Sequence, residues 1–566
     1  MQIVLTTLNA KFTHLSLALR YLKEYCQQDF PEIITLEYNI NQPLPLIMAE
    51  IVAQKPDIIG FSCYIWNIEQ TLEIAGNIKK VLPQTTIILG GPEVSYDFEP
   101  LLKEHPFIDF VVSGEGEEAF LKLLHVLTTD GNKEQLRKVP GLVYRDRGTI
   151  KLSPNPTVDL AKIPNVYHPN DDLEHKIVYY ESSRGCPFRC EYCLSSRTGA
   201  VRYFPLERVK RELRILADKN IEQVRFIDRT FNCHPKRATE LLAFMAELET
   251  RTRFQLEIAG DLLTDEMIEI LKKAPPGRFQ FEIGVQSTNP ATLEAISRKT
   301  DLEKLACNLR KLREETNVRV LLDLIAGLPY EDYNSFGRSF DYVYDLQPTT
   351  IHLGFLKLLK GSSLREKAEE FGCVFTDKAP YEVLQTDAIS YQELQRLHVI
   401  KDLVDKYYNS HRFNDSLAYI TEKYGNSGFK FFDQFAQHWV DEGCHLVSHT
   451  QEKLYKLFYD LMGEKDVKLR DLLKLDYRKN ERKRPTPEWM GTRDDFKLEN
   501  QIIRSGKIFE VLPELKSLSP REIGKQIKIE YFDSLDRWIL FHYPVDSDLG
   551  ISYFLTQDLL TECDSE

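Results

Sequence analysis

Residues 182–196 read SSRGCPFRCEYCLSS and carry three cysteines, Cys186, Cys190 and Cys193, in a CxxxCxxC spacing. The triplet follows an apolar segment with the pattern of a strand, Ile177–Tyr180, and precedes a helical pattern. Three thiolates on one tight loop can bind three irons of a 4Fe–4S cluster, which leaves the fourth iron without a protein ligand. An open iron can bind a small molecule, so the spacing indicates a catalytic cluster rather than an electron carrier.

Two other uses of the cysteines are weaker. A structural zinc site needs four closed ligands, and no second Cys/His pair follows at finger-like spacing. Disulfides need an oxidising compartment, and the seven remaining cysteines are scattered as core or surface residues: Cys26, Cys63, Cys233, Cys307, Cys373, Cys444 and Cys563. The expected location is therefore the reducing cytoplasm.

The chain has 566 residues, 42% of them hydrophobic, which suggests three or four domains with several cores. Its formal net charge of −13 disfavours binding to a nucleic-acid backbone. The first residues, MQIVLTTLNAKF, begin a strand and do not resemble a signal peptide. No apolar stretch approaches the ~20 residues that span a bilayer, so no membrane span is expected.

Residues 1–130 alternate short apolar runs with helical patterns, which is typical of a parallel, doubly wound sheet of the Rossmann or flavodoxin type. Ligands of such sheets bind at the carboxyl ends of the strands. The residues at those ends are small or polar: Ser62, Gly90, Gly91, and Gly114 with Glu115 and Gly116. Glycine lets a bulky planar ligand approach the backbone, although a glycine pair can equally be a plain turn. The stretch GEGEE, residues 114–118, has no lysine, so a phosphate loop is not expected.

The rest of the chain divides into three parts. Residues 131–175 are expected to form a β-hairpin and a Pro/Asn/Asp-rich linker. Residues 176–365 again alternate strands and helices, and six β/α units suit a partial TIM-like barrel with its chemistry at the C-terminal strand ends. The six expected strands are Ile177–Tyr180, Gln223–Ile227, Phe254–Ala259, Phe279–Val285, Val318–Ile325 and Thr350–Phe355.

Residues 366–566 are expected to form a mostly α-helical domain, because apolar residues recur at helical spacing. Its many aromatic residues could line a substrate pocket, but such stripes favour a packed core. A basic run from Arg478 to Arg484 could meet a phosphate, a carboxylate or RNA; a solvated helix end is the preferred interpretation.

The cysteine loop, with Tyr192 before its last cysteine, resembles the radical S-adenosylmethionine (SAM) superfamily. The strings GVQS, SRKT and DLIAGLP are similar to those of the oxygen-independent coproporphyrinogen dehydrogenase and methylthiotransferase branch. The resemblance implies that Gln286 and Asp323 bind the ribose or methionyl part of SAM, that Arg298 faces its carboxylate and that Glu257 takes its amino group or ribose. The Gly-Gly-Glu motif of the family is absent, and Asp228 in FIDRTFN is the expected substitute.

The first segment resembles the cobalamin-binding domain that precedes the barrel in one class of radical SAM enzymes. Ser62 and the pair Gly90–Gly91 fall at the positions of that family's serine and glycines, and Gly114 at a further strand end. The family's Asp-x-His-x-x-Gly motif is missing; His14 lies in that region without the Asp or the Gly, and is more readily an ordinary residue than a cobalt ligand. A flavodoxin-like domain without cofactor is the alternative.

The resemblance implies a function. A flavodoxin or ferredoxin would reduce the cluster, SAM would be cleaved to a 5′-deoxyadenosyl radical, and an unactivated carbon of a small-molecule or peptide substrate would be methylated from cobalamin. The alternatives are a cobalamin-assisted cyclisation or rearrangement, a non-catalytic iron–sulfur sensor, and methylthiolation, which the absence of a second cysteine triplet disfavours. The order of domains resembles a bacterial cobalamin-dependent radical SAM family whose C-terminal domain has no assigned role.

Overall fold

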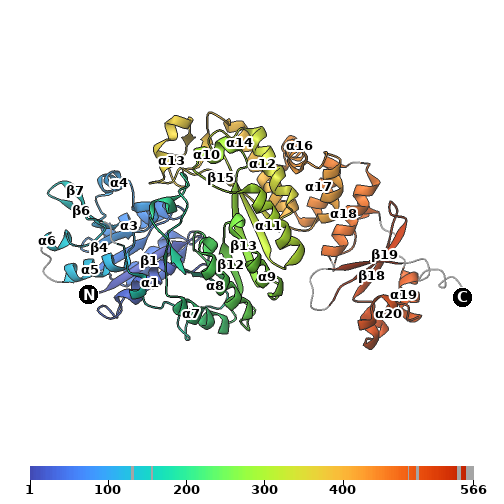
Figure 1. Cartoon of the computed structure of the whole chain (residues 1–566), viewed down its shortest axis with the longest axis horizontal. Helices are drawn as coiled ribbons and strands as arrows, with labels where there is room; N and C mark the ends of the chain where they lie inside the picture. Colours follow the sequence, from blue (N-terminus) through green and yellow to red (C-terminus); the bar gives the residue numbers. More distant parts are fainter. Residues whose placement is uncertain are drawn as a thin grey trace. The chain divides into compact units, whose positions relative to one another are not determined.

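The structure is a computed structural model of the chain, and it describes residues 1–128, 133–154, 157–463, 465–481, 484–491, 496–544 and 550–555. Two compact units are distinguished, Met1–Leu394 and Gln395–Glu566, whose elements are drawn in Figure 1. The domain boundaries drawn from the sequence stay predictions; the last of them falls at residue 366, whereas the compact units divide after Leu394. Cys563 lies outside the described residues.

Seven strands form the first sheet, in the spatial order β2–β1–β3–β4–β5–β6–β7. The first five pair in parallel: β1 Ile3–Asn9, β2 Ile34–Asn39, β3 Ile58–Ser62, β4 Thr86–Gly90 and β5 Phe110–Val112. The expected hairpin forms β6 (Leu142–Asp146) and β7 (Thr149–Leu152), and β6 pairs antiparallel with β5. The hairpin thus extends the first sheet instead of standing apart in a linker.

Helices cover both faces of this sheet, because neighbouring residues of a strand point to opposite sides and the strands are apolar on both. Val4 and Ile59 pack in one buried cluster with residues of α2, α3 and α4. Leu5 and Ile58 pack in a second with residues of α1 and α5. The prediction of a doubly wound sheet is confirmed. The helices are α1 Leu17–Cys26, α2 Leu44–Ala53, α3 Ile68–Val81, α4 Phe98–Glu104, α5 Glu117–Thr128 and α6 Lys133–Leu136.

Six parallel strands form the second large sheet, in the order β15–β14–β13–β12–β11–β8. Since β8 and β15 are its two edges, it is the open, partial barrel that the sequence predicts. The strands are β8 Ile177–Tyr180, β11 Gln223–Phe226, β12 Arg253–Glu257, β13 Phe279–Gln286, β14 Arg319–Ala326 and β15 Thr350–Phe355. The intervening helices are α7 Leu206–Asp218, α8 Pro235–Glu247, α9 Asp265–Lys273, α10 Pro290–Ala295, α11 Leu302–Glu315 and α12 Tyr333–Asp345.

Strict alternation along the barrel strands separates an apolar face from a polar one. In β13 the four apolar side chains are buried, and every second position is partly exposed. In β14 the pattern repeats, with Asp323 on the partly exposed face. One face of these two strands therefore packs in the core, while the other carries the partly exposed residues, among them Glu282, Gln286 and Asp323.

The segment after the barrel contains short elements, α13 Ser363–Glu366, β16 Val374–Phe375 and β17 Val383–Gln385, before the long helix α14 Tyr391–Leu403. The second unit is helical at first, as the sequence predicts. Its helices are α15 Asn414–Glu422, α16 Gly428–Asp441, α17 Gln451–Met462, α18 Val467–Asn480, α19 Phe496–Arg504, α20 Ile508–Val511 and α21 Pro520–Ile523.

The second unit also contains a three-stranded antiparallel sheet that the sequence analysis missed. It consists of β18 Ile527–Phe532, β19 Arg537–His542 and β20 Ile551–Phe554, in the order β18–β19–β20. The alternation in IKIEYF and the apolar run in RWILFH, which are separated by four residues, were the signal that would have found the first two strands.

Aromatic residues of the second unit form a packed core. Tyr407, Phe435 and Trp439 are fully buried, and the Phe435 ring stacks on that of Phe458 with centroids 5.6 Å apart. The interpretation of the aromatic stripes as core is confirmed. The interpretation of the basic run as a solvated helix end is wrong for Arg478, whose side chain is 2% exposed and pairs with Glu530 at 2.7 Å. Residues 482 and 483 of that run lie outside the described residues.

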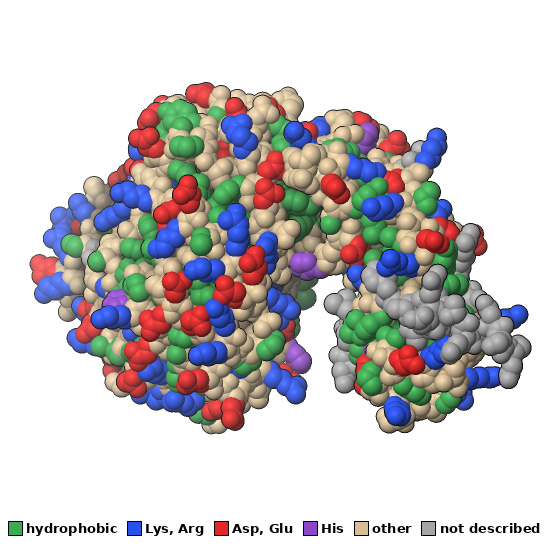
Figure 2. All heavy atoms as spheres, turned by 45° about the vertical axis from the view of Figure 1, so that its right-hand side comes forward, with side chains coloured by type: hydrophobic (Ala, Val, Ile, Leu, Met, Phe, Trp, Pro, Cys, Tyr) green, Lys and Arg blue, Asp and Glu red, His purple; other side chains and the backbone are tan. Residues whose placement is uncertain are grey.

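Basic and acidic side chains are intermingled over the face displayed in Figure 2, and no large area carries one sign. Such a surface does not favour a polyanion. In the described part of the chain, no helix combines the length and the apolar character required to cross a membrane.

Candidate active site

The three cysteines lie on a loop whose two ends are joined at its base. Strand β9 (Ser183–Arg184) pairs antiparallel with β10 (Arg202–Tyr203), which closes residues 185–201 into one loop after β8. Gly185 begins the loop with a φ of +99°, and a Cβ atom there would lie 2.8 Å from the Ala200 carbonyl oxygen. Only glycine fits this close approach, so the sequence RGC sets the geometry of the base of the loop.

Within the loop, Cys190 is buried, whereas Cys186 and Cys193 are partly exposed. The Cys190 Sγ atom accepts a hydrogen bond of 3.8 Å from Arg298 Nη1, and the Glu191 N–H donates to the Ile296 carbonyl oxygen at 3.0 Å. Burial raises the pKa of the Cys190 thiol, and the Arg298 cation opposes that shift. The loop is thereby attached to the segment that follows α10.

Among the described residues, no group of three His, Cys, Asp or Glu side chains could hold a metal ion. A 4Fe–4S cluster makes a different demand, because each cysteine binds its own iron and the thiols need not converge on one point. Three cysteines on one loop, with a guanidinium beside one sulfur, are a donor set that fits such a cluster.

Gln286 and Arg298 each hold a buried polar atom that has no hydrogen-bond partner among the described residues. Gln286 ends β13 with a φ of +70°, at a point where the pairing with β14 shifts register. Its Oε1 atom and the Arg298 Nε atom are buried without a hydrogen-bond partner. Buried polar groups are rarely left unpaired, and a strained backbone at a strand end is typical of a binding site. The two residues therefore fit a polar ligand next to the cysteine loop.

Tyr192 lies beside this position, and Glu257 and Asp323 lie on β12 and β14, the two strands next to β13. Tyr192 interacts with Cys190 and Arg298, and burial raises the pKa of its hydroxyl. Burial raises the pKa of Glu257, the last residue of β12, to about 7. Asp323 lies 3.1 Å from His352 Nδ1, and burial raises its pKa, with His352 opposing.

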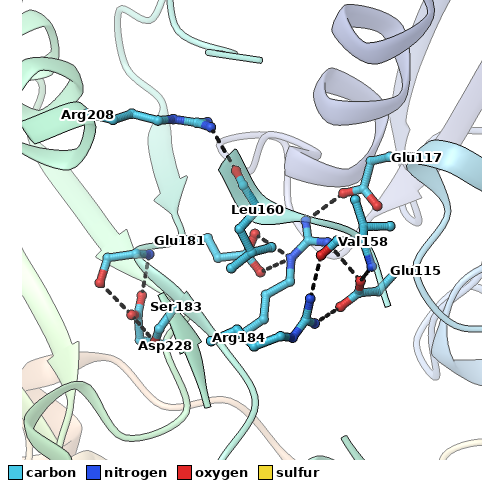
Figure 3. A network of polar contacts seen from close by, with 11 residues as sticks. Glu115, Glu117, Val158, Leu160, Glu181, Ser183, Arg184, Arg208 and Asp228 are labelled. Carbon is cyan, nitrogen blue, oxygen red and sulfur yellow. Dashed lines mark hydrogen bonds and ion pairs between the residues drawn. The ribbon is translucent and has the colours of Figure 1, made fainter. Parts of the chain in front are cut away.

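Asp228 has a different setting from the one that its role as a SAM contact requires. It is 1% exposed, and its carboxylate accepts hydrogen bonds from the Ser182 N–H at 2.8 Å, from Ser182 Oγ at 2.6 Å and from Ser183 Oγ at 2.5 Å. The bond to Ser183 is drawn in Figure 3. In this structure Asp228 braces the start of the cysteine loop.

Some polar residues of the barrel escaped the sequence analysis. Arg225 on β11 pairs with Glu282 on β13 at 2.9 Å, and Gln255 on β12 donates to the same carboxylate at 2.7 Å. His352 on β15 completes the set through Asp323. The signal was present in the alternation of each strand, but only the sheet order shows that these side chains meet.

In the first domain, Ser62 and Gly90 end the neighbouring strands β3 and β4. The Ser62 carbonyl oxygen accepts from Thr7 Oγ1 at 3.0 Å, and the Gly90 carbonyl oxygen accepts from the Cys63 N–H at 2.7 Å. Gly91 has a φ of +107°, and a Cβ atom there would lie 2.5 Å from the Cys63 carbonyl oxygen. Packing alone thus explains Gly91. Gly114 is exposed, and its N–H donates to Ser95 Oγ at 3.2 Å.

A pair of alanine variants separates packing from ligand approach at these glycines. We expect Gly91→Ala to lower the free energy of unfolding by about 2 kcal/mol, because a strained φ and a backbone clash coincide. Gly90→Ala, whose Cβ would lie 3.7 Å from the Val112 carbonyl oxygen, should cost about 0.5 kcal/mol or less. Thermal unfolding of the two variants checks this. Equal losses in both would contradict it, and loss of bound cobalamin in a stable Gly90→Ala would indicate ligand approach.

His14 lies against the barrel. Its Nδ1 atom is 3.1 Å from the Tyr179 hydroxyl, the two rings meet edge to face with centroids 5.5 Å apart, and its backbone forms a bridge with Ile177. Burial lowers the pKa of His14. These contacts favour the interpretation of His14 as an ordinary packed residue.

Three parts of the chain match known families. Residues 3–124 match the B12 binding domain, residues 180–343 match the radical SAM superfamily, and residues 369–540 match a family described as a protein of unknown function (DUF4080). The chain therefore carries a B12-binding domain followed by a radical SAM domain.

Curated proteins are similar to parts of this chain. The cobalamin-dependent radical SAM methyltransferase TokK of Streptomyces tokunonensis is 28% identical over 66% of this chain and 58% of its own. Hopanoid C-3 methylase of Methylococcus capsulatus is 26% identical over 49% of this chain and 55% of its own. Anaerobic magnesium-protoporphyrin IX monomethyl ester cyclase of Rubrivivax gelatinosus is 24% identical over 58% and 61%. The chain thus spans about half to three-fifths of the length of these relatives.

Solved structures share the fold. OxsB, a cobalamin-dependent SAM radical enzyme solved with aqua-cobalamin and SAM, has a TM-score of 0.60 at 16% identity, over 84% of this chain and 78% of its own. The radical SAM methyltransferase TsrM of Kitasatospora setae has a TM-score of 0.56 at 18% identity, over 66% and 77%. At these identities the similarity shows the fold alone.

Proposed function

We propose that this chain is a cobalamin-dependent radical SAM enzyme that methylates an unactivated carbon of a small-molecule or peptide substrate. The supporting observation is the cysteine loop next to the unsatisfied Gln286 Oε1 and Arg298 Nε atoms, in one compact unit with a B12-binding domain. The relatives named as methyltransferases and methylases favour methylation. An electron donor of the flavodoxin or ferredoxin type and a cytoplasmic location stay predictions.

Under this proposal the cysteines, Arg298 and Gln286 have separate roles. Cys186, Cys190 and Cys193 would hold the cluster, which together with SAM supplies the 5′-deoxyadenosyl radical, while cobalamin supplies the methyl group. The guanidinium of Arg298 offers planar N–H groups to the SAM carboxylate. The Gln286 amide oxygen would accept a hydrogen bond from the ribose or the amino group of SAM.

Glu257 would supply negative charge near the cationic SAM. With its pKa raised to about 7, the carboxyl is neutral at pH 6 and mostly ionised at pH 8. Because the pKa is raised on folding, the folded chain holds a proton on Glu257 between the ordinary pKa and about 7, where the unfolded chain has lost it. The free energy of unfolding therefore falls as the pH rises through this window. The charge that attracts SAM appears over the same window.

We therefore expect SAM to bind up to about tenfold more tightly at pH 8 than at pH 6. The two pH values lie about one unit below and about one unit above the pKa, so the carboxyl is mostly neutral at the first and mostly ionised at the second. Glu257→Gln should flatten this pH profile. Glu331→Gln is the matched control, since burial also raises the pKa of Glu331 to about 7 but its carboxylate accepts from Ser287 and Ser339. Isothermal titration of the reconstituted protein measures the affinity; an unchanged profile in Glu257→Gln would contradict the assignment.

Anaerobic reconstitution with iron and sulfide, followed by dithionite, SAM and cobalamin, tests the proposed function. We expect 5′-deoxyadenosine, and S-adenosylhomocysteine when methylcobalamin turns over. Cleavage of SAM without any methyl transfer would favour ring closure or rearrangement, the chemistry named in the cyclase relatives. Binding of a cluster without SAM cleavage would favour a sensor.

A further inference from the structure

The base of the cysteine loop carries two arginines side by side. Arg184 on β9 and Arg202 on β10 are directly paired across this two-stranded sheet. The Arg184 guanidinium extends toward Glu115 and Glu117 at the start of α5, in the B12-binding domain (Figure 3), and Arg202 pairs with the same Glu115. Cations at the base of the loop therefore meet carboxylates of another domain.

The contacts are short and largely shielded from water. Arg184 Nη2 lies 2.5 Å from Glu117 Oε1, and its Nη1 lies 3.8 Å from Glu115 Oε2. Arg202 pairs with Glu115 and donates to the Val158 carbonyl oxygen at 2.7 Å. The side chains of Arg184 and Glu117 are only 13% and 6% exposed, so this pair is not a weak surface ion pair.

Further groups fix the Arg184 side chain. Its guanidinium lies 5.4 Å from the ring centre of Tyr21 on α1 and 6.0 Å from that of Phe204. Its Nε atom lies 3.1 Å from both carboxylate oxygens of Glu181. Arg184 thus contacts α1 and the β5–α5 loop of the first domain and, on its own side, the end of β8.

Arg184 also lies close to the first cysteine of the triplet. Only Gly185 separates it from Cys186, and the closed base transmits any displacement of Arg184 to residues 185–201. The stretch GEGEE, which lacks the lysine of a phosphate loop, provides carboxylates that match these two arginines. No contact to SAM or cobalamin is required for this arrangement, so we treat Arg184 as a positioning residue.

We propose that Arg184, Arg202, Glu115 and Glu117 form an interdomain clamp that holds the cysteine loop in one position relative to the strand ends of the B12-binding domain. The cofactors that the loop and the strand ends would carry rest on the proposed function. The clamp keeps the cluster site and the cobalamin site at a constant separation. Without it the loop still exists, but it samples more than one position.

Hydrogen exchange of the full-length, metal-free chain tests the clamp without any cofactor. We expect Arg184→Gln and Glu117→Gln to raise the exchange of amides in residues 185–201 about tenfold or more, with Arg184→Lys intermediate because one ion pair remains. Arg20→Gln is the matched control. Arg20 pairs with Asp171 at 2.9 Å and is 23% exposed, but it joins α1 to the linker and not to the loop.

A second readout uses the loaded protein. In Arg184→Gln the spin–spin interaction between the reduced cluster and cob(II)alamin should become weaker or more heterogeneous, whereas Arg20→Gln should match the unmodified chain. Unchanged exchange of residues 185–201 in Glu117→Gln and Arg184→Lys, or an equal rise in Arg20→Gln, would overturn the clamp. If the chain binds neither cluster nor cobalamin, the proposed function fails, while the exchange comparison still decides the clamp.

Discussion

Cys190→Ala is expected to abolish the iron–sulfur cluster and with it all SAM cleavage. Cys190 is the buried member of the triplet, and its sulfur is the one that Arg298 contacts at 3.8 Å. Loss of one thiolate leaves two cysteines for a cluster that already has one open iron. Iron content, the visible absorption of the cluster and 5′-deoxyadenosine formation measure the effect. The same loss is expected for Cys186→Ala and Cys193→Ala.

Cys233→Ala is the control for this experiment. The Cys233 thiol lies 3.4 Å from the Tyr203 hydroxyl. Burial is the main cause that raises the pKa of Cys233, and the nearby Cys186 thiol adds to the rise. We expect the variant to retain its iron and its SAM cleavage. A loss of iron there would mean that a fourth cysteine closes the cluster, and the open iron on which SAM binding depends would not exist.

Glu530→Gln is expected to destabilise the second unit by about 3–5 kcal/mol, because it leaves two buried cations without their shared carboxylate. Glu530 on β18 is fully buried; Arg478 Nε donates to it at 2.7 Å, and Lys474 Nζ lies 3.7 Å away. Both cations come from α18, so the carboxylate joins that helix to the sheet. Calorimetry of the full chain, with hydrogen exchange of residues 467–480 and 527–532, measures the loss.

Two comparisons make this result interpretable. Asp405→Asn removes an exposed pair with Lys401, whose side chains are 37% and 46% exposed, and should cost about 0.5 kcal/mol or less. The double variant Arg478→Met, Glu530→Leu should recover part of the lost stability, since apolar groups of similar volume can replace a buried ion pair. A small effect of Glu530→Gln would show that water reaches this pair.

Local patterns carried much of what could be predicted. The parallel strands of the first sheet, the six barrel strands and the three cysteines can each be recognised in a short stretch of sequence. Burial of a strand on one face or on both leaves a local pattern that does not depend on distant residues. Gln286 and Arg298 were named from their strings, and the structure leaves one buried polar atom of each without a partner among the described residues. Their role as SAM contacts stays a prediction. The missed sheet β18–β20 lay in a region interpreted by its helices alone.

The sequence by itself determined which elements form and which loop holds the thiols, since alternation, helical spacing and glycine at a closed base act within a few residues. Only the tertiary structure decided the partners of the charged groups. It assigned Asp228 to Ser182 and Ser183, and Arg184 to Glu117. It also placed Arg478, which the sequence analysis had interpreted as solvated, against Glu530 in the interior. A charge is stable in the interior only when an opposite charge or hydrogen-bond donors meet it; for these residues the partners come from distant segments, and the folded chain alone brings those segments together.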